Sequence, residues 1–172
     1  MNYDIWGSWS STVGPNAPLN DSCAPTPEGS AVSAVKAWTT AGFPANKIIL
    51  GVASYGHSFH VDDASALDAS GNLKLYPPFD KTQQPAGDKW DPAGGGGGVD
   101  VCGNPTVAGS GGNFEFWGLI DGGFLTTNGT AASGIDYVFD NCSQTVRALS
   151  PRASACERSG GGLPLFDGPF ST

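Results

Sequence analysis

The sequence predicts an α/β protein, because a short apolar segment, a helical segment and a second apolar segment follow one another near its start. Residues 1–5 have the length and apolar character of a short buried strand. Residues 47–54 contain a continuous Ile-Ile-Leu-Gly-Val run, which is typical of a strand buried on both faces of a parallel sheet. With a helix between them, the two segments predict one right-handed β-α-β unit.

The segment between the two strands has the signals of a helix. Residues 14–27 are rich in Pro, Asn, Asp and Ser and indicate a surface loop, and Ser30 is a suitable N-cap after it. Gly42 and Pro44 end the helical pattern. One apolar helix face carries Val32, Val35 and Trp38. Because such units present their sites at the carboxyl ends of the strands, side chains that end the two strands are expected on one rim.

The pattern changes in the second half of the chain. Residues 58–145 contain short aromatic and β-branched runs broken by turns, and one helix is predicted at about residues 112–120. Strands are predicted at residues 76–79 and 135–139, so this part is interpreted as a small α+β module on the rim. Residues 146–172 carry all three arginines and no lysine, and they have no periodic apolar run. We expect this tail to be disordered.

Composition and charge exclude several classes of partner. The chain has 172 residues and a formal net charge of −8, and its lysines are scattered, so a nucleic acid would be repelled. No apolar run approaches the roughly 20 residues that cross a bilayer, so no membrane contact is expected. His57 and His60 lie on opposite faces of a strand and have no evident third ligand, so no metal is expected.

Three segments resemble family 18 of the glycoside hydrolases, the chitinases, and they occur in the order of that family. Met1-Asn2-Tyr3-Asp4 is similar to the sixth barrel strand, and residues 47–59 are similar to the seventh strand with its following turn. Residues 134–140 resemble a strand of the α+β domain that chitinases insert after strand seven. The resemblance covers residues 1–145 and implies a C-terminal fragment of a fungal-type chitinase.

The implied fold is a partial TIM (β/α)8 barrel with a small α+β insertion domain. Strands six and seven of the barrel would lie in residues 1–57, the chitinase insertion domain in residues 58–145 and a divergent tail in residues 146–172. A complete barrel typically needs roughly 250 residues, which is more than this chain contains.

The resemblance also implies a parent enzyme that hydrolyses β-1,4-linked N-acetylglucosamine polymers, namely chitin and chitooligosaccharides, without a cofactor. The substrate's own N-acetyl oxygen is the nucleophile of this retaining mechanism, and the protein supplies a general acid. In the family that acid is the Glu of an Asp-x-x-Asp-x-Asp-x-Glu run, which this chain lacks. Neither Glu28 nor Glu115 is expected on the rim, so the chain alone is predicted to be inactive.

Four polar residues at the strand ends correspond to positions of the family cleft. Tyr3 matches the tyrosine whose hydroxyl meets the acetamido oxygen, and Asp4 matches the aspartate that hydrogen-bonds near the acetamido group, so both are auxiliary catalytic residues. Tyr55 matches a cleft tyrosine of strand seven. His57 stands where many family members carry Arg, which replaces a permanent forked donor with a group that titrates near neutrality.

Two tryptophans at the start of the chain are candidates for sugar contacts. Trp9 resembles an aromatic residue that stacks on sugar rings, because an indole plane suits the C–H face of a sugar. Trp6 is either a second sugar contact or a core residue beneath Trp9.

The cysteines indicate a secreted parent protein. Cys102 and Cys142 flank the insertion domain that the resemblance implies and are the expected disulfide partners, although four cysteines allow three connectivities. Cys23 and Cys156 would be left over, with Cys23 free. Three glycosylation sequons, at Asn20, Asn128 and Asn141, also favour an extracellular location, and the chain itself shows no signal peptide. A monomer is expected.

Two alternatives to a chitinase fragment remain open at this point. A non-catalytic chitin-binding or lectin-like module would keep the aromatic cleft residues without an acid. A degenerate product that does not fold stably would expose raw parallel strand edges.

Overall fold

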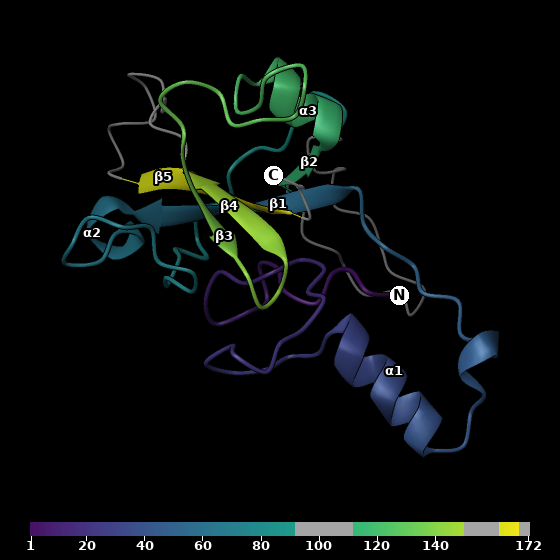
Figure 1. The fold of residues 1–172 in the computed structure, drawn as a ribbon. Helices are drawn as coiled ribbons and strands as arrows, with labels where there is room; N and C mark the ends of the chain where they lie inside the picture. The colour runs from purple at the N-terminus through teal and green to yellow at the C-terminus, as the bar shows by residue number, and fades with distance from the viewer. Residues whose placement is uncertain (92–111, 150–161, 169–172) are drawn as a thin grey trace, which may run out of the picture.

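A five-stranded antiparallel sheet is the centre of the computed structural model, which describes residues 1–91, 112–149 and 162–168 (Figure 1). The strand order is β2-β1-β5-β4-β3. The strands are β1 Tyr55–Asp62, β2 Asn113–Glu115, β3 Asp136–Asp140, β4 Thr145–Leu149 and β5 Gly162–Gly168. The helices are α1 Ala31–Thr40, the 3-10 helix η1 Ala45–Lys47, α2 Asp63–Ala66 and α3 Phe116–Asp121.

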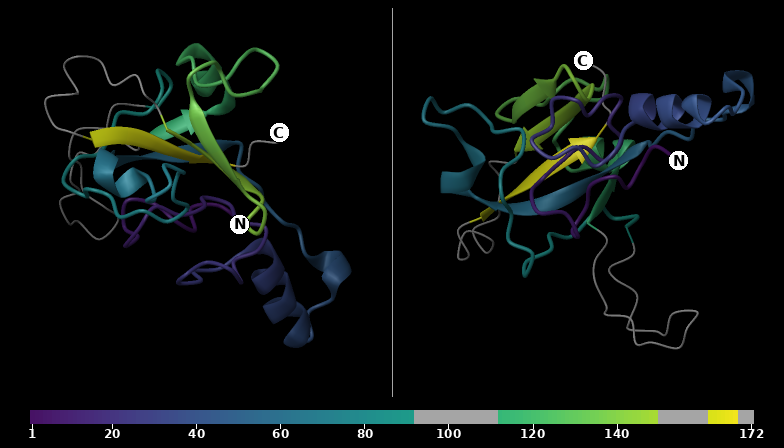
Figure 2. Two further views of the ribbon diagram at one scale, coloured as in Figure 1. Left: turned by 60° about the vertical axis from the view of Figure 1, so that its left-hand side comes forward. Right: turned by 90° about the horizontal axis from the view of Figure 1, so that it is seen from below.

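Helix α1 begins and ends where the sequence predicted. The Ser30 hydroxyl accepts from the Ser33 backbone N–H at 3.1 Å, and the Ser33 hydroxyl accepts from the Ser30 N–H at 2.8 Å, which completes a capping box. Gly42, with φ 90°, follows the last turn. Figures 1 and 2 show that α1 extends away from the sheet.

The two segments predicted as barrel strands touch at one point. Asn2 and Val52 form a parallel bridge, and the Asn2 N–H donates to the Gly51 carbonyl at 2.9 Å. Burial on both faces was wrong, since Ile49 is 95% exposed and Val52 is also exposed. The physical reason is that Asn2 is the one bridge partner of this segment among the described residues, and an open pocket lies between α1 and residues 48–50.

The module differs in detail from its prediction. Strand β3 confirms the strand expected at residues 135–139. Residues 112–120 are divided between β2 and α3 instead of forming one helix, and residues 76–79 are not a strand. Strand β1 spans Tyr55–Asp62 without a break, so it crosses the domain boundary that was predicted after residue 57.

The tail contains two strands, so the expected disorder was wrong at these positions. β4 pairs with β3, and β5 lies between β1 and β4, antiparallel to both. Buried and partly buried residues alternate along β4, but the sequence pattern does not show it, because the fully buried residue at the centre of the strand is the charged Arg147. Its guanidinium lies 4.8 Å from the ring centroid of Tyr76, a cation-π contact that satisfies part of the buried charge.

Two apolar clusters pack against the sheet. The larger one contains Val13, Phe59, Val61, Ala66 and Leu149, with Phe79 against Phe59 at 4.9 Å between ring centroids. The smaller one joins β2 to α3 and contains Phe114, Leu119 and Phe124. In the described residues, no helix is both long and apolar enough to span a membrane.

A disulfide joins Cys23 to Cys142, with a Cα–Cα distance of 6.4 Å. The expected pairing of Cys102 with Cys142 was therefore wrong, and so was the free thiol expected at Cys23. Cys102 and Cys156 lie outside the described residues. The bond ties the loop before α1 to the turn between β3 and β4, across a sequence separation of 119 residues.

We predict that Phe59→Ala lowers the free energy of unfolding by about 3–5 kcal/mol, because it empties a fully buried site in the larger cluster. Ile49→Ala is the control, and it should change the free energy by less than about 0.5 kcal/mol because Ile49 is exposed. Urea unfolding measures both. Equal effects of the two variants would contradict the placement of the core.

We also predict that non-reducing peptide mapping recovers a Cys23–Cys142 cross-link. Trypsin leaves Cys102 and Cys142 on one peptide, because no Lys or Arg lies between residues 89 and 147, so a second protease must cut between the two cysteines. Changing Cys23 and Cys142 together to Ser should cost about 2–5 kcal/mol of stability, because the long loop is then unrestrained in the unfolded chain. A cross-link from Cys102 to Cys142 would contradict the structure.

Candidate functional site

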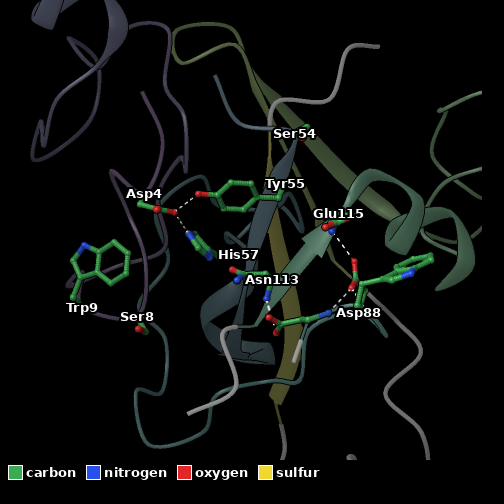
Figure 3. Close-up of a pocket in the computed structure, with 11 residues that line it drawn as sticks. Asp4, Ser8, Trp9, Ser54, Tyr55, His57, Asp88, Asn113 and Glu115 are labelled. Atoms are coloured by element: carbon green, nitrogen blue, oxygen red, sulfur yellow. Dashed lines mark hydrogen bonds and ion pairs between the residues drawn. The ribbon is translucent and has the colours of Figure 1, made fainter. Parts of the chain in front are cut away.

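A cleft of about 490 Å³ opens between the first ten residues, the start of β1, the loop before β2 and β2 itself. In Figure 3, Asp4 and Trp9 lie on one side, Asp88 and Glu115 on the other, and His57 and Asn113 between them. The cleft is lined by Asp4, Ser8, Trp9, Ser54, Tyr55, His57, Asp88, Trp90, Asp91, Asn113 and Glu115.

Asp4 is the point where the two chain segments meet. Its Oδ1 accepts a hydrogen bond of 2.5 Å from the Tyr55 hydroxyl and lies 3.1 Å from His57 Nε2. Tyr55 and His57 reach the same oxygen because residues two apart on a strand face the same side. Asp4 itself has φ 55°, in the left-handed region that only a few non-glycine residues adopt.

The electrostatics of this contact keep Tyr55 a hydrogen-bond donor. Burial, followed by the hydrogen bond to Asp4 and the charge of Asp4, raises the pKa of Tyr55 above its ordinary value. Since the phenol stays protonated, Asp4 Oδ1 remains engaged. Among the described residues, the side-chain contacts of Asp4 are made by Oδ1, and the Asp4 side chain is 48% exposed, so Oδ2 can accept from a ligand.

Asn16 holds the two segments together, and no sequence pattern predicted this role. Its Oδ1 accepts from the Asp4 N–H at 2.8 Å, and its Nδ2 donates to the Tyr55 carbonyl at 2.8 Å. The side chain is completely buried. Asn16 stands in a loop rich in Pro and Asn, where an asparagine is usually a turn residue, and this composition hid its role.

The two tryptophans have different roles. Trp9 lines the cleft, is 58% exposed and packs edge-on against His57 at 6.1 Å between ring centroids. Trp6 is 1% exposed, and its ring centroid lies 5.8 Å from that of Tyr76. Of the two roles considered for Trp6, the structure therefore favours a core residue over a sugar contact. Gly7 lies under the Trp9 ring, where any Cβ would meet ring atoms at 2.3 Å.

Tyr3 lies beside the cleft and is absent from its lining. Its ring packs edge-on against Tyr55 at 6.4 Å between ring centroids, and a Cβ at Gly51 would approach it to 3.1 Å. The structure therefore brings Asp4, Trp9, Tyr55 and His57 together at the cleft, with Tyr3 behind them. Their contacts with sugar stay predictions.

The far wall of the cleft contains residues that the sequence analysis missed. Glu115, which was placed in a helix away from the rim, instead ends β2 and lies directly opposite Tyr55 in the strand register. Asp88 accepts from the Glu115 N–H at 2.7 Å and from the Trp90 and Asp91 N–H groups at 2.9 and 3.0 Å. The signal was weak, because an Asp after Gly is an ordinary turn residue.

Among the described residues, no three His, Cys, Asp or Glu side chains are grouped so that they could hold a metal ion. What the cleft offers is an exposed indole, free carboxylate oxygens and hydrogen-bonding side chains. An indole suits the C–H face of a sugar, and polar side chains suit its hydroxyl groups, so the chemistry of this cleft is compatible with a carbohydrate ligand.

A comparison with known protein families identifies the family of this chain. Glycosyl hydrolases family 18 matches residues 1–138, and the chain belongs to this family.

Three known proteins are similar to this chain. A "chitinase-like effector" of Moniliophthora roreri is 52% identical over 155 residues, which are 88% of this chain and 36% of the effector. A chitinase from Rhizomucor miehei has a TM-score of 0.71 and 31% identity, covering 95% of this chain and 40% of the enzyme. A family 18 chitinase mutant from Cycas revoluta in complex with (GlcNAc)4, with TM-score 0.57 and 18% identity, covers 99% and 34% and shows the fold alone.

We predict that Asn16→Ala opens the cleft and lowers stability by about 1–3 kcal/mol, because it leaves the Asp4 N–H and the Tyr55 carbonyl without their partner. Asn72→Ala is the control, since Asn72 bonds Asp68 on the exposed surface. Thermal unfolding measures stability, and the quenching of Trp9 fluorescence by iodide reports the opening. An equal loss in the two variants would contradict the role of Asn16.

Proposed function

We propose that this chain binds chitooligosaccharides in the cleft and does not hydrolyse them by itself. The observation that carries the proposal is the exposed Trp9 indole, which lies next to the Asp4, Tyr55 and His57 cluster in a chain of family 18. One sugar ring stacks on Trp9. Its polar groups meet Asp4 Oδ2 and the other hydrogen-bonding side chains of the cleft.

The geometry supports binding through a fixed acceptor. Tyr55 and His57 both hold Asp4 through Oδ1, so the carboxylate is oriented before a ligand arrives, and less freedom is lost on binding. Asp4 Oδ2 can then accept from an acetamido N–H or from a sugar hydroxyl. The resemblance to the family supports this role, since Asp4 matches the aspartate that hydrogen-bonds near the acetamido group.

Hydrolysis requires a general acid that this sequence does not supply. The Asp-x-x-Asp-x-Asp-x-Glu run of the family is absent from it. Glu28 lies in an exposed loop outside the cleft lining, and Glu115 accepts a hydrogen bond of 3.1 Å from the Trp117 indole N–H. Such an acid contributes about 100- to 10,000-fold in rate, so turnover by this chain is expected to be negligible.

The relatives suggest what a longer protein would do. The chain covers 36% of the Moniliophthora roreri effector and 40% of the Rhizomucor miehei chitinase. Residues 1–57 would supply barrel strands six and seven of a longer hydrolase, and the general acid would lie in a part of that longer protein outside these 172 residues. The Cys23–Cys142 disulfide supports an extracellular location for it.

We predict that Trp9→Ala weakens binding of (GlcNAc)4 about tenfold, because the loss of one stacking contact of about 0.5–1.5 kcal/mol is joined by the loss of its buried area. Trp38→Ala is the matched control, because Trp38 is 60% exposed on α1 outside this cleft. Isothermal titration calorimetry measures both. Undiminished binding by Trp9→Ala, or an equal loss in Trp38→Ala, would remove the proposal.

A chitooligosaccharide hydrolysis assay tests the second half of the proposal. The chain should release no product above the rate of a buffer control, and Glu115→Gln should leave that result unchanged. Product release that disappears in Glu115→Gln would instead make Glu115 a general acid. A urea unfolding curve with no cooperative transition would favour the unstable product over both functions.

A further inference from the structure

The three glycosylation sequons of the chain have different surroundings in the fold. A sequon is Asn-x-Ser/Thr, and the glycan that it accepts is bulky and must project from the surface. Asn20 is half-buried, whereas Asn128 and Asn141 are exposed. Of the hydroxyl residues in the latter two sequons, Thr130 is exposed and Ser143 is 1% exposed. Asn128 and Thr130 are therefore the one pair of the three in which both residues lie at the surface.

We propose that Asn128 is the N-glycosylation site of this chain and that Asn20 and Asn141 stay unmodified. The inference goes beyond the binding function, and it rests on the extracellular location proposed above. The co-reactant is an oligosaccharide linked to a lipid through a diphosphate. Asn128 Nδ2 forms a bond to the anomeric carbon of this oligosaccharide and loses one proton to a base of the transferring enzyme. The bond from that carbon to the diphosphate breaks, and the diphosphate leaves with the electron pair.

Asn128 lies at the tip of a closed loop. An antiparallel bridge between Leu125 and Ala131 forms the base of this loop, and the Gly129 N–H donates to the Thr126 carbonyl at 2.9 Å. Gly129 has φ 83°, a backbone conformation that glycine adopts without steric cost. Exposed loop tips with small and polar residues are the places where a chain best tolerates additions.

The side chains of the loop leave the amide nitrogen of Asn128 available. Asn128 Oδ1 accepts from the Thr126 hydroxyl and, at 3.5 Å, from the Thr130 hydroxyl. The two threonine hydroxyls lie 2.7 Å apart. Among the described residues, the side-chain contacts of Asn128 are thus made by Oδ1, and Nδ2 can act as the nucleophile. The hydroxyl of the sequon is already held next to the amide.

Folding closes the sequon at Asn141. The buried Ser143 hydroxyl donates to Asp140 Oδ2 at 2.7 Å, so the group that defines the sequon has a partner in the core. The middle residue of the sequon, Cys142, is joined to Cys23 by the disulfide. Transfer at Asn141 therefore has to precede both the folding of this turn and the formation of the bond.

The sequon at Asn20 lies on the other side of the same disulfide. Its Oδ1 accepts from the Ser22 N–H at 3.1 Å, and its backbone carbonyl lies 3.9 Å from Cys142 Sγ. The middle residue, Asp21, is 7% exposed and accepts from the Ser30 hydroxyl at 2.8 Å. This sequon is thus packed between the disulfide and the cap of α1, where a bulky glycan would disturb both.

A glycan at Asn128 leaves the cleft open. None of the residues that line the cleft comes from residues 125–131. Figures 1 and 2 show α3 and the loop after it on the side of the sheet opposite α1. The loop is placed against α3, since a Cβ at Gly129 would approach the Phe116 ring to 3.3 Å. We therefore expect (GlcNAc)4 to bind equally well with and without the glycan.

Secretion of the 172-residue chain from a yeast, behind an added export leader, tests the proposal. A peptide N-glycosidase in heavy-oxygen water leaves a labelled Asp at each modified position, which distinguishes it from the spontaneous deamidation to which Asn-Gly is prone. Trypsin leaves Asn128 and Asn141 on one peptide, so a second protease that cuts after Tyr137 or Phe139 separates them. The label is expected at Asn128 in most chains, and at neither Asn20 nor Asn141.

Matched variants assign the glycan to its residue. Asn128→Gln should remove the mass of one glycan from the secreted protein, and Thr130→Ala should do the same although it keeps the amide. Asn20→Gln and Asn141→Gln are the controls and should leave that mass in place. The labelled map of the unchanged chain decides the question even where a variant is not secreted.

The outcomes separate this inference from the proposed function. Label at Asn20 or Asn141 without label at Asn128, or no label at any of the three, would overturn the proposal. A glycan that remains in Asn128→Gln would do so as well. If Asn128 is labelled and (GlcNAc)4 does not bind, the binding function fails and the modification site stands.

Discussion

Two hydrogen bonds from one buried amide hold the candidate site together. Asn16 accepts from the backbone of Asp4 and donates to the backbone of Tyr55, so it joins segments that are 51 residues apart in sequence. A buried amide that lost either partner would leave an unsatisfied group in the core, which makes the arrangement strongly preferred. The positive φ of Asp4 is tolerated because three contacts hold this residue in place: Asn16 accepts from its backbone N–H, and Tyr55 and His57 contact its carboxylate.

The same first segment lies beside an edge that the described chain does not cover. Met1, Ile49 and Val52 are largely exposed, and Asn2 and Val52 make the only parallel bridge that is described there. Parallel strands are normally covered on both faces, so this edge is compatible with the greater length of the relatives. The antiparallel sheet is different, because its two apolar clusters come from residues within the described chain. Stability is therefore concentrated in the sheet, and the cleft lies where the two parts meet.

Local signals in the sequence predicted what depends on neighbouring residues. Helix α1 could be predicted because its Ser30 cap and its Gly42 stop act within a few residues, and β3 because it is a short aromatic and β-branched run between turns. The Cys23–Cys142 bond could not, because only tertiary geometry chooses among three pairings. Strand β4 was missed because Arg147 breaks its apolar pattern, and the ring of Tyr76 that receives it lies far away in sequence.

The candidate site was predictable to a similar extent. The structure brings Asp4, Tyr55 and His57 together at the cleft, as the sequence predicted, but Tyr55 and His57 begin β1 instead of ending a strand at residues 47–54. The far wall could not be found in this way, since Glu115 reaches the cleft through its antiparallel pairing with Tyr55, which no local pattern encodes. Asp88 then fixes the end of β2 by accepting from the Glu115 backbone.

The two walls consequently depend on different contacts. The side of the cleft that contains Asp4 and Trp9 depends on Asn16 and on Gly7, which leaves room for the Trp9 ring. The side that contains Glu115 depends on the pairing of β1 with β2. A change in the loop before β2 can therefore alter the charge of the cleft without moving the Trp9 indole. The two sides of the cleft can vary separately, although both contact β1.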